Sequence, residues 1–211
     1  MKENKIKFAV VGCGHIGKRH AEMVTRDQDA ELVALCDIRP REELGIEAYE
    51  VPFFAGLQEL LQSGIQIDVI NICTPNGLHA PMAVQAIEAG CNVVIEKPMA
   101  LTLADAEKVV YASLKYRKQV FCVMQNRYSP PSVWIKDMID SGKLGKIYMV
   151  QLNCYWNRDE RYYKPVAGMG MQHWMGVRFS PSSPILLISC TGCLAIFVIS
   201  RLVSQISITR N

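Results

Sequence analysis

The sequence predicts a doubly wound α/β domain built on a parallel sheet, followed by the incomplete start of a second α/β domain. Over residues 1–125, short apolar runs rich in β-branched residues alternate with amphipathic stretches. Strands that are apolar along their whole length are typical of a parallel sheet that helices cover on both faces. Several of the amphipathic stretches end at glycine, which commonly follows the last turn of a helix. Both observations favour the alternation of strand and helix that defines this class.

Six runs have the composition of buried strands, with apolar and β-branched residues bounded by turn formers. They are residues 7–12, 31–37, 51–54, 67–75, 91–98 and 119–125. Four stretches between them place apolar residues at helical spacing. They are residues 15–27, 57–64, 79–90 and 103–116. Each predicted helix connects two predicted strands, as the crossover between parallel strands requires.

The pattern changes after Gln125. A loop is followed by a predicted helix at about 131–140, and residues 146–156 alternate like a half-buried strand. We therefore expect three parts in the chain. They are the doubly wound domain at 1–125, the start of a second α/β domain at 126–165, and a segment of different character at 166–211.

Composition excludes several classes of function. The net charge of +3 is too small to indicate binding to nucleic acid or to an anionic membrane surface. The N-terminus is apolar for only a few residues before a glycine, which predicts a strand and not a signal peptide. Among eight cysteines, Cys36, Cys73 and Cys122 lie in apolar runs, which favours free thiols in a reducing, cytoplasmic setting. Cys190 and Cys193 form an isolated C-x-x-C pair, so no metal site is expected.

A glycine loop follows the first predicted strand. Gly12, Gly14 and Gly17 have G-x-G-x-x-G spacing and lead directly into a predicted helix. In this context the pattern indicates a Rossmann dinucleotide site, in which glycines permit a tight turn, close approach of a pyrophosphate, and helix–strand packing. The helix N-terminus, with His15 and Ile16, then presents N–H groups to the phosphates. Glycines that serve only as a turn are the plainer alternative.

Asp37 ends the second predicted strand, 20 residues after Gly17. A carboxylate at this place accepts hydrogen bonds from the adenine ribose hydroxyls and repels a 2′-phosphate. This favours NAD over NADP, although the nearby Arg39 weakens the argument.

Unusual polar residues follow the fourth and fifth predicted strands, where ligands of open α/β sheets bind. They are Thr74, Pro75, Asn76 and His79 after the fourth strand, and Glu96, Lys97 and Pro98 after the fifth. In an arbitrary protein, Lys97 would most often be a solvated lysine at a strand end. Beside a glycine loop, it is expected to lie near the nicotinamide of the cofactor.

The segments GCGHIG, TPNGLH, EKP and NRYSPP at these intervals resemble the Gfo/Idh/MocA family of NAD(P)-dependent sugar oxidoreductases. The resemblance covers residues 5–165, and YWNRDERYY at 155–163 is most similar to the branch that oxidises nucleotide-linked N-acetylhexosaminuronic acids. It implies a Rossmann domain, a second α/β domain with a large open sheet, a sugar or nucleotide-sugar substrate, and homo-oligomers. It also implies hydride transfer from a sugar carbinol to the nicotinamide.

The resemblance assigns roles to individual residues. Lys97 corresponds to the lysine that binds and deprotonates the reacting hydroxyl, and a histidine shortly after a D-G-G segment would complete the acid–base chemistry. Pro75 and Asn76 would line the nicotinamide, and Glu96 and Asn126 would hold cofactor and substrate. The implied substrate contacts are Arg127, Tyr128, Trp156, Arg158 and Tyr163. For the three aromatic residues, ordinary sheet packing is an equal alternative.

The last segment differs chemically from the rest. Residues 1–165 carry 20 acidic and 20 basic side chains, whereas residues 166–211 carry three arginines and no Asp, Glu or Lys. Residues 179–200 have no charged side chain, and a run of this length is a candidate transmembrane helix. A tail-anchored membrane protein is therefore one alternative. The other is a shift in reading frame, because the D-G-G and histidine implied by the resemblance are missing here.

Some codons test a frame shift from the protein alone. In the reading frame that starts at the third base of each codon, each new codon combines bases of two neighbouring ones. The codons of Trp174 and Met175 then give aspartate, and the codon of Met175 with any following glycine codon gives glycine. His173 followed by Trp174 encodes leucine with either histidine codon. The shifted frame thus reads Leu-Asp-Gly, and further codon choices restore a second glycine, a histidine and acidic residues. We expect that one G was lost after the Pro165 codon.

The sequence therefore predicts a cofactor-binding chain whose catalysis is impaired by an out-of-frame tail, with no membrane and no nucleic acid as partner. A non-catalytic dinucleotide-binding or sensor protein is the main alternative from another class. Binding of NADH without turnover of any sugar would favour that alternative.

Overall fold

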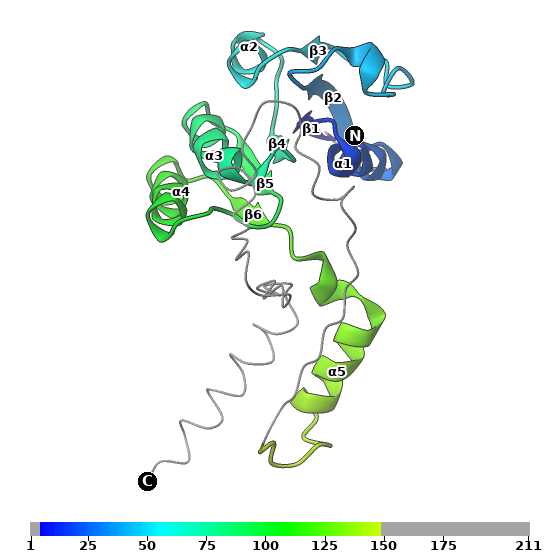
Figure 1. Cartoon of the computed structure of the whole chain (residues 1–211), viewed down its shortest axis with the longest axis vertical. Coiled ribbons are helices and arrows are strands. Elements are labelled where there is room, and N and C mark those ends of the chain that lie inside the picture. Colours follow the sequence, from blue (N-terminus) through cyan, green and yellow to red (C-terminus); the bar gives the residue numbers. More distant parts are fainter. Residues whose placement is uncertain (1–4, 149–211) are drawn as a thin grey trace, which may run out of the picture. The chain divides into compact units, whose positions relative to one another are not determined.

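The computed structural model describes residues 5–148 (Figure 1). The chain divides into two compact units, whose described parts are residues 5–123 and 124–148. The first unit holds the sheet and four of the helices, and the second holds one further helix.

The first unit is built on one six-stranded sheet in the order β3-β2-β1-β4-β5-β6. The strands are β1 (Ile6–Val11), β2 (Ala30–Cys36), β3 (Phe53–Phe54), β4 (Val69–Ile72), β5 (Asn92–Ile95) and β6 (Val120–Cys122). All five pairings are parallel. This is the strand order of the doubly wound dinucleotide-binding fold. The predicted fold class is confirmed.

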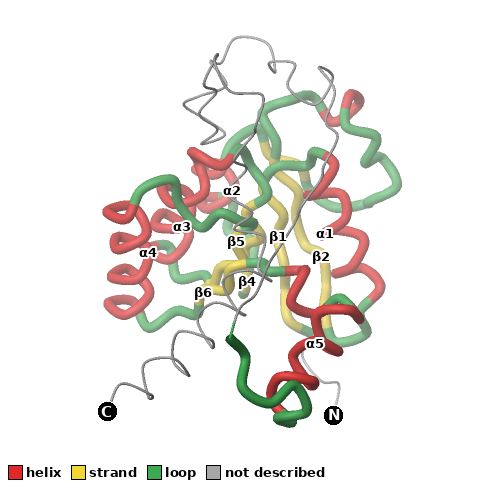
Figure 2. The backbone as a smooth tube through the Cα atoms, turned by 60° about the horizontal axis from the view of Figure 1, so that its bottom comes forward, coloured by secondary structure: helices red, strands yellow, loops and turns green. Residues whose placement is uncertain are grey.

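Helices cover the sheet from both sides. Figure 2 shows α1 (His15–Arg26) on one side of the strands, and α3 (His79–Glu88) and α4 (Leu103–Tyr116) on the other. The short helix α2 (Leu57–Gln62) follows β3. Because neighbouring residues of a strand point to opposite faces, the first strand contributes to two cores. Ala9 packs in the larger core with α3 and α4, and Val10 packs in the smaller one with α1.

The observed strands are shorter than the predicted ones at the edge where the candidate site lies. The run 67–75 forms a strand only over Val69–Ile72, and Pro75 then leads into a single 3-10 turn, η2 (Asn76–Leu78). Pro75 has no N–H to continue the ladder, so the chain leaves the sheet here. Two other 3-10 turns, η1 (Arg41–Glu43) and η3 (Gln125–Tyr128), were not expected from periodicity.

The second unit contains η3 and the helix α5 (Pro130–Asp140), which matches the predicted helix at about 131–140. Proline at the first turn of α5 costs no hydrogen bond, because N–H groups there have no intrahelical partner. Of the predicted strand at 146–156, residues 146–148 form no strand, and residues 149–156 lie outside the described residues, as does the whole segment 166–211. Across residues 5–148, no helix has both the length and the apolar character to span a membrane.

Candidate dinucleotide-binding site

The loops after β1, β2, β4 and β5 all leave the same edge of the sheet, because the strands are parallel. Strand order reverses between β1 and β4, and ligands of such sheets bind at this point. Most of the site residues predicted from the sequence belong to these four loops.

The three glycines after β1 have different surroundings. Gly12 has a φ of +88°, and a Cβ there would lie 2.7 Å from the backbone of Cys73. A Cβ on Gly17 would lie 1.7 Å from the carbonyl oxygen of Gly12, so neither position accepts a side chain without backbone movement. A Cβ on Gly14 would meet only the Arg39 guanidinium, at 3.9 Å. Gly12 and Gly17 are thus required by packing, whereas Gly14 borders open space.

The N-terminus of α1 suits an anion. Gly14 is its N-cap and offers no side-chain hydrogen bond, and the first turn holds no acidic residue. The first N–H groups of a helix lack intrahelical partners and carry a partial positive charge. His15 and Ile16, the first residues of α1, are exposed beside this end. A pyrophosphate can therefore be held here by backbone N–H groups.

Asp37 joins the end of β2 to the glycine loop. Its Oδ2 accepts a hydrogen bond from the backbone N–H of Cys13 at 2.7 Å, and its Oδ1 accepts one from the N–H of Arg39 at 2.9 Å. The Arg39 side chain lies 3.5 Å from Oδ1, and the Asp37 side chain is 9% exposed. A carboxylate oxygen accepts more than one hydrogen bond, so Asp37 can brace the loop and still accept from a ribose hydroxyl.

The structure changes the role expected for His79. This residue begins α3 and is only 1% exposed. Its Nδ1 lies 2.7 Å from the carbonyl oxygen of Pro98, and its Nε2 lies 2.7 Å from that of Thr74. Both ring nitrogens are therefore used within the protein, and the ring joins two loops instead of facing the open edge. In the same loop, Pro75 is exposed and Asn76 is half-buried.

Glu96 and Lys97 form the turn after β5. The Nε2 of His20, on α1, lies 3.0 Å from Glu96 Oε1, and the Lys97 backbone N–H donates to Oε2 at 3.2 Å. Burial raises the pKa of Glu96, but the hydrogen bond and charge of His20, together with Lys97, outweigh it, so that the pKa is lowered overall. The Lys97 side chain is exposed, and the peptide bond that joins it to Pro98 is cis. Glu96 is thus held by the protein itself.

Sequence reasoning gave no role to His20, which the structure places beside Glu96. His20 follows Gly17 by three residues, so both lie on the same side of α1, and Gly17 packs against the glycine loop. That spacing could have indicated that His20 faces the sheet and not the solvent. Its partner, 76 residues away, could not be found from local periodicity.

The thiols near the site are at least partly buried, and burial disfavours their reactive thiolate forms. Burial raises the pKa of Cys13 to about 11 and that of Cys36 to about 12, and it raises the pKa of Cys73 further. The five cysteines within the described residues are free thiols, as expected for Cys36, Cys73 and Cys122. Residues 5–148 contain no group of three or more His, Cys, Asp or Glu side chains arranged to hold a metal.

The remaining predicted residues belong to the second unit or lie outside the described residues. Asn126, Arg127 and Tyr128 lie on η3 in the second unit, where all three are exposed. Trp156, Arg158 and Tyr163 lie outside the described residues.

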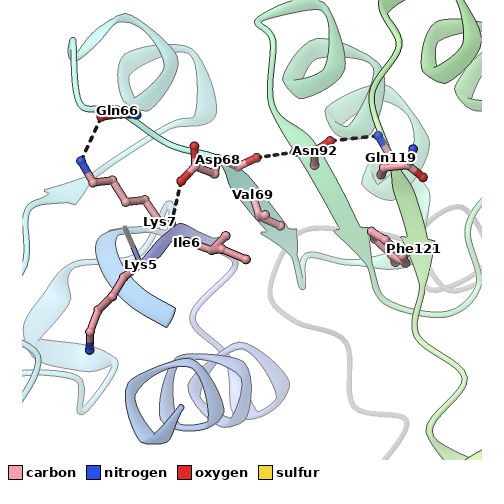
Figure 3. A pocket seen from close by; sticks show the side chains of 9 residues that line it. All are labelled: Lys5, Ile6, Lys7, Gln66, Asp68, Val69, Asn92, Gln119 and Phe121. Carbon is pink, nitrogen blue, oxygen red and sulfur yellow. Dashed lines mark hydrogen bonds between the residues drawn. The ribbon is translucent and has the colours of Figure 1, made fainter. Parts of the chain in front are cut away.

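A hollow lies at the opposite end of the strands from the candidate site (Figure 3). It has a volume of about 600 Å³ and is lined by the amino-terminal ends of β1, β4, β5 and β6. A chain of hydrogen bonds runs across it, in which Asn92 donates to the Asp68 carbonyl and accepts from the Gln119 N–H. It is remote from the carboxyl ends of the strands and shares no residue with the candidate site.

The strand order, the packed glycines and the open N-terminus of α1 define a dinucleotide-binding protein of the Rossmann class. The family described as "Oxidoreductase family, NAD-binding Rossmann fold" (Gfo/Idh/MocA) matches residues 6–124. The chain belongs to this family. The family resemblance stated from the sequence, including the NAD-binding type of fold, is confirmed.

Solved structures and curated proteins extend the comparison. A WlbA dehydrogenase from Chromobacterium violaceum, solved with NADH and UDP-GlcNAcA, is 33% identical with a TM-score of 0.76, over 83% of this chain and 51% of that one. The WlbA dehydrogenase from Bordetella pertussis, solved with the same two ligands, is 35% identical with a TM-score of 0.76, over 82% and 53%. Inositol 2-dehydrogenase from Salmonella typhimurium is 33% identical over 150 residues, which are 69% of this chain and 44% of that protein. The chain thus spans about half the length of these relatives.

Proposed function

We propose that this chain carries the dinucleotide-binding part of an NAD-dependent oxidoreductase that oxidises a hydroxyl group of a sugar or nucleotide sugar. The observation that supports it most is the gathering of four functional loops at one edge of the sheet. These are the glycine loop, the loop of Asp37, the loop of Asn76, and the turn of Lys97. Membership of an NAD-binding oxidoreductase family agrees with this arrangement.

The residues present fit the cofactor. Gly14 borders open space where a pyrophosphate needs close approach to the backbone, and the first turn of α1 holds no carboxylate that would repel it. Glu96 is already paired with His20, so in our proposal it supports the turn and does not hold the cofactor by direct contact. The candidate contacts are Gly12, Gly14, His15, Ile16, Gly17, Asp37, Thr74, Pro75, Asn76, Lys97 and Asn126.

Lys97 is the proposed acid–base residue. Its exposed side chain leaves the carboxyl end of β5, two strands from the glycine loop, so it can reach a substrate hydroxyl at this edge. When bound, the nicotinamide supplies the acceptor for the hydride of the carbinol carbon. The role of Lys97 is to bind the hydroxyl and to take its proton, which typically contributes about 10²–10⁴-fold to the rate.

We propose NAD in preference to NADP because of Asp37. Its carboxylate is fixed by two backbone N–H groups at the end of β2, where it would repel a ribose 2′-phosphate. Asp37→Ser is expected to narrow the difference between NADH and NADPH affinity, measured by fluorescence titration. Equal affinities for the two cofactors in the unmodified chain would contradict this assignment. The thermal midpoint of the variant serves as the control, because Asp37 also braces the glycine loop.

The proposed substrate class is a nucleotide sugar. The two WlbA dehydrogenases were solved with UDP-GlcNAcA, and the segment 155–163 resembles the branch that acts on such compounds. Arg127, Tyr128, Trp156, Arg158 and Tyr163 remain the proposed substrate contacts. Arginines can pair with the diphosphate through two parallel hydrogen bonds, and tyrosine or tryptophan can pack against sugar rings. A homo-oligomer is proposed from the same resemblance.

We also propose that the chain as printed binds cofactor but is catalytically impaired. The support lies in the sequence of residues 166–211, which lacks the D-G-G segment and following histidine that the family resemblance implies, and whose shifted frame reads Leu-Asp-Gly. The second acid–base group and most of the substrate-binding sheet would then be missing. The nucleotide sequence across codons 160–180 tests this directly.

Two measurements on the purified chain test the proposed function. Fluorescence titration is expected to show saturable NADH binding, and Gly14→Ala is expected to weaken it. Turnover is then measured with NAD and a panel of UDP-sugars, inositols and free sugars. Absence of NADH binding would overturn the proposal. Binding without turnover, together with a nucleotide sequence that shows no lost base, would instead favour the sensor protein.

A further inference from the structure

Two histidines hold the turn that carries Lys97, one on each side of it. On one side, His20 Nε2 lies 3.0 Å from Glu96 Oε1. On the other, His79 Nδ1 lies 2.7 Å from the carbonyl oxygen of Pro98. Lys97 therefore lies between two residues, Glu96 and Pro98, that are each contacted by a histidine side chain.

The two histidines come from opposite faces of the sheet. His20 lies on α1, His79 lies on α3, and the strands separate these helices (Figure 2). The turn is also tied to its neighbouring strand, because the Glu96 N–H donates to the Ile72 carbonyl at 3.0 Å. A short turn that is anchored in two opposite directions and to the sheet has little freedom to tilt.

His79 couples this turn to a second loop of the candidate site. Its Nε2 lies 2.7 Å from the carbonyl oxygen of Thr74, immediately before Pro75 and Asn76. Both partners of His79 are backbone carbonyl oxygens, and the ring lies between them with one nitrogen facing each. One side chain thus sets the spacing between the loop after β4 and the turn after β5.

Burial makes these contacts persistent. His79 is 1% exposed, and the side chains of His20 and Glu96 are 15% and 13% exposed. Breaking either contact would leave a buried carbonyl or carboxylate without its partner and with little access to water. The exposed Lys97 side chain consequently extends from a fixed base.

We propose that His20 and His79 are positioning residues that form a two-histidine clamp on the turn of Glu96, Lys97 and Pro98. The clamp sets where the Lys97 ammonium group reaches relative to the loop of Asn76. This inference rests on the proposed function of Lys97, whereas the clamp itself is a matter of geometry. A purely structural role would affect stability without changing the environment of Lys97.

Nuclear magnetic resonance of reductively ¹³C-methylated lysines in the full chain separates these roles. The methylation keeps the lysine charge, and the Lys97 resonance is identified by its absence in Lys97→Arg. In the unmodified chain, the Lys97 resonance should differ from that of the exposed Lys108 and should move on addition of NADH. Lys108 serves as the internal control, because it lies on α4 and pairs with Asp105.

Matched variants at each histidine keep or remove one bond. A glutamine amide nitrogen occupies nearly the position of a histidine Nε2, and an asparagine amide nitrogen nearly that of Nδ1. His79→Asn and His20→Gln should therefore keep the Lys97 resonance and its response to NADH. His79→Gln and His20→Leu should move the resonance toward that of Lys108 and abolish its response. Each variant should still bind NADH, because the glycine loop and Asp37 are not altered, and its affinity is titrated in parallel so that the resonance is compared at saturation.

Each outcome decides the matter. If His79→Gln and His20→Leu fold, bind NADH and leave the Lys97 resonance and its response unchanged, the clamp is overturned. If Lys97 in the unmodified chain ignores NADH while these variants still move its resonance, the clamp stands and the proposed function of Lys97 fails. If either variant does not fold, hydrogen exchange of the Lys97 amide in the unmodified chain decides. A clamped turn predicts slow exchange, and exchange as fast as in exposed loops would overturn the proposal.

Discussion

At the scale of single residues, the glycine loop shows how one spacing pattern hides three different requirements. Gly12 needs a positive φ and has no room for a Cβ, and Gly17 has no room because the Gly12 carbonyl oxygen would lie 1.7 Å away. Gly14 has no positive φ, and within the protein a Cβ there would have room. The space beside Gly14 is therefore available to a ligand, as a dinucleotide site requires.

This difference predicts separable effects of alanine. Gly17→Ala should lower stability by about 1–3 kcal/mol or more, because the backbone of the loop must move to admit the methyl group. Gly14→Ala should leave the thermal midpoint unchanged and weaken NADH binding. Gly56→Ala is the control, since it also precedes a helix and would place its methyl group in open space. Equal thermal midpoints for Gly17→Ala and Gly56→Ala would contradict the packing argument.

Buried thiols give a second prediction at this scale. Because the pKa of Cys13 is about 11 and that of Cys36 about 12, the thiolate fractions at pH 8 are roughly 10⁻³ and 10⁻⁴. Alkylation with iodoacetamide in the native state, followed by peptide mass spectrometry, should leave both residues unmodified. The same treatment in urea should modify them fully. Rapid native labelling of either one would show that this part of the core opens readily.

At the scale of elements, the turn after β5 depends on the charge of Glu96. The pKa of this carboxyl in the folded chain lies below its usual value of 4.5. Its contribution to stability is therefore fully present above pH 4.5, and it is lost as the pH falls through the lowered value. The free energy of unfolding of Glu96→Gln should be below that of the unmodified chain at pH 7. The gap should close on acidification in urea titrations, and a gap that is constant with pH would contradict the lowered pKa of Glu96.

The ends of elements were also harder to predict than their existence. The run 67–75 is apolar almost throughout, yet it forms a strand only over Val69–Ile72. Thr74 and Pro75 leave the ladder so that η2 can form and place Asn76 at the edge of the sheet. Hydrophobic periodicity does not show where a strand ends, because residues that follow the strand can remain partly buried after the hydrogen-bond pattern has changed.

At the scale of the whole molecule, catalysis is expected to depend on the reading frame of the last segment. Inserting one G after the Pro165 codon should produce a chain that oxidises a nucleotide sugar with NAD. The chain as printed is expected to show little or no turnover under the same conditions, because residues 166–211 lack the D-G-G segment and following histidine that the family resemblance implies. Lys97→Ala in the inserted version should lower the rate by about 10²–10⁴-fold, the usual contribution of a positioned acid–base residue. An ordinary enzymatic rate from the chain as printed would show that the frame-shift hypothesis is wrong.

Much of this protein was determined by the sequence itself. Alternation of apolar strands with amphipathic helices specifies a parallel doubly wound sheet, and in such a sheet every strand end emerges at one known edge. The residues after β1, β2, β4 and β5 could therefore be placed together before any contact was known. The glycine spacing added the chemistry of the ligand, because a helix N-terminus with open backbone N–H groups suits a phosphate.

Only the tertiary structure decided how that edge is held together. His79 turned out to join two loops through Thr74 and Pro98, and His20 pairs with Glu96 across 76 residues of sequence. The tertiary structure also decided which glycines are closed by packing and which one borders open space. The physical reason is that periodicity reports which face of an element is buried, whereas a hydrogen bond between distant segments depends on distances that exist only after the elements pack.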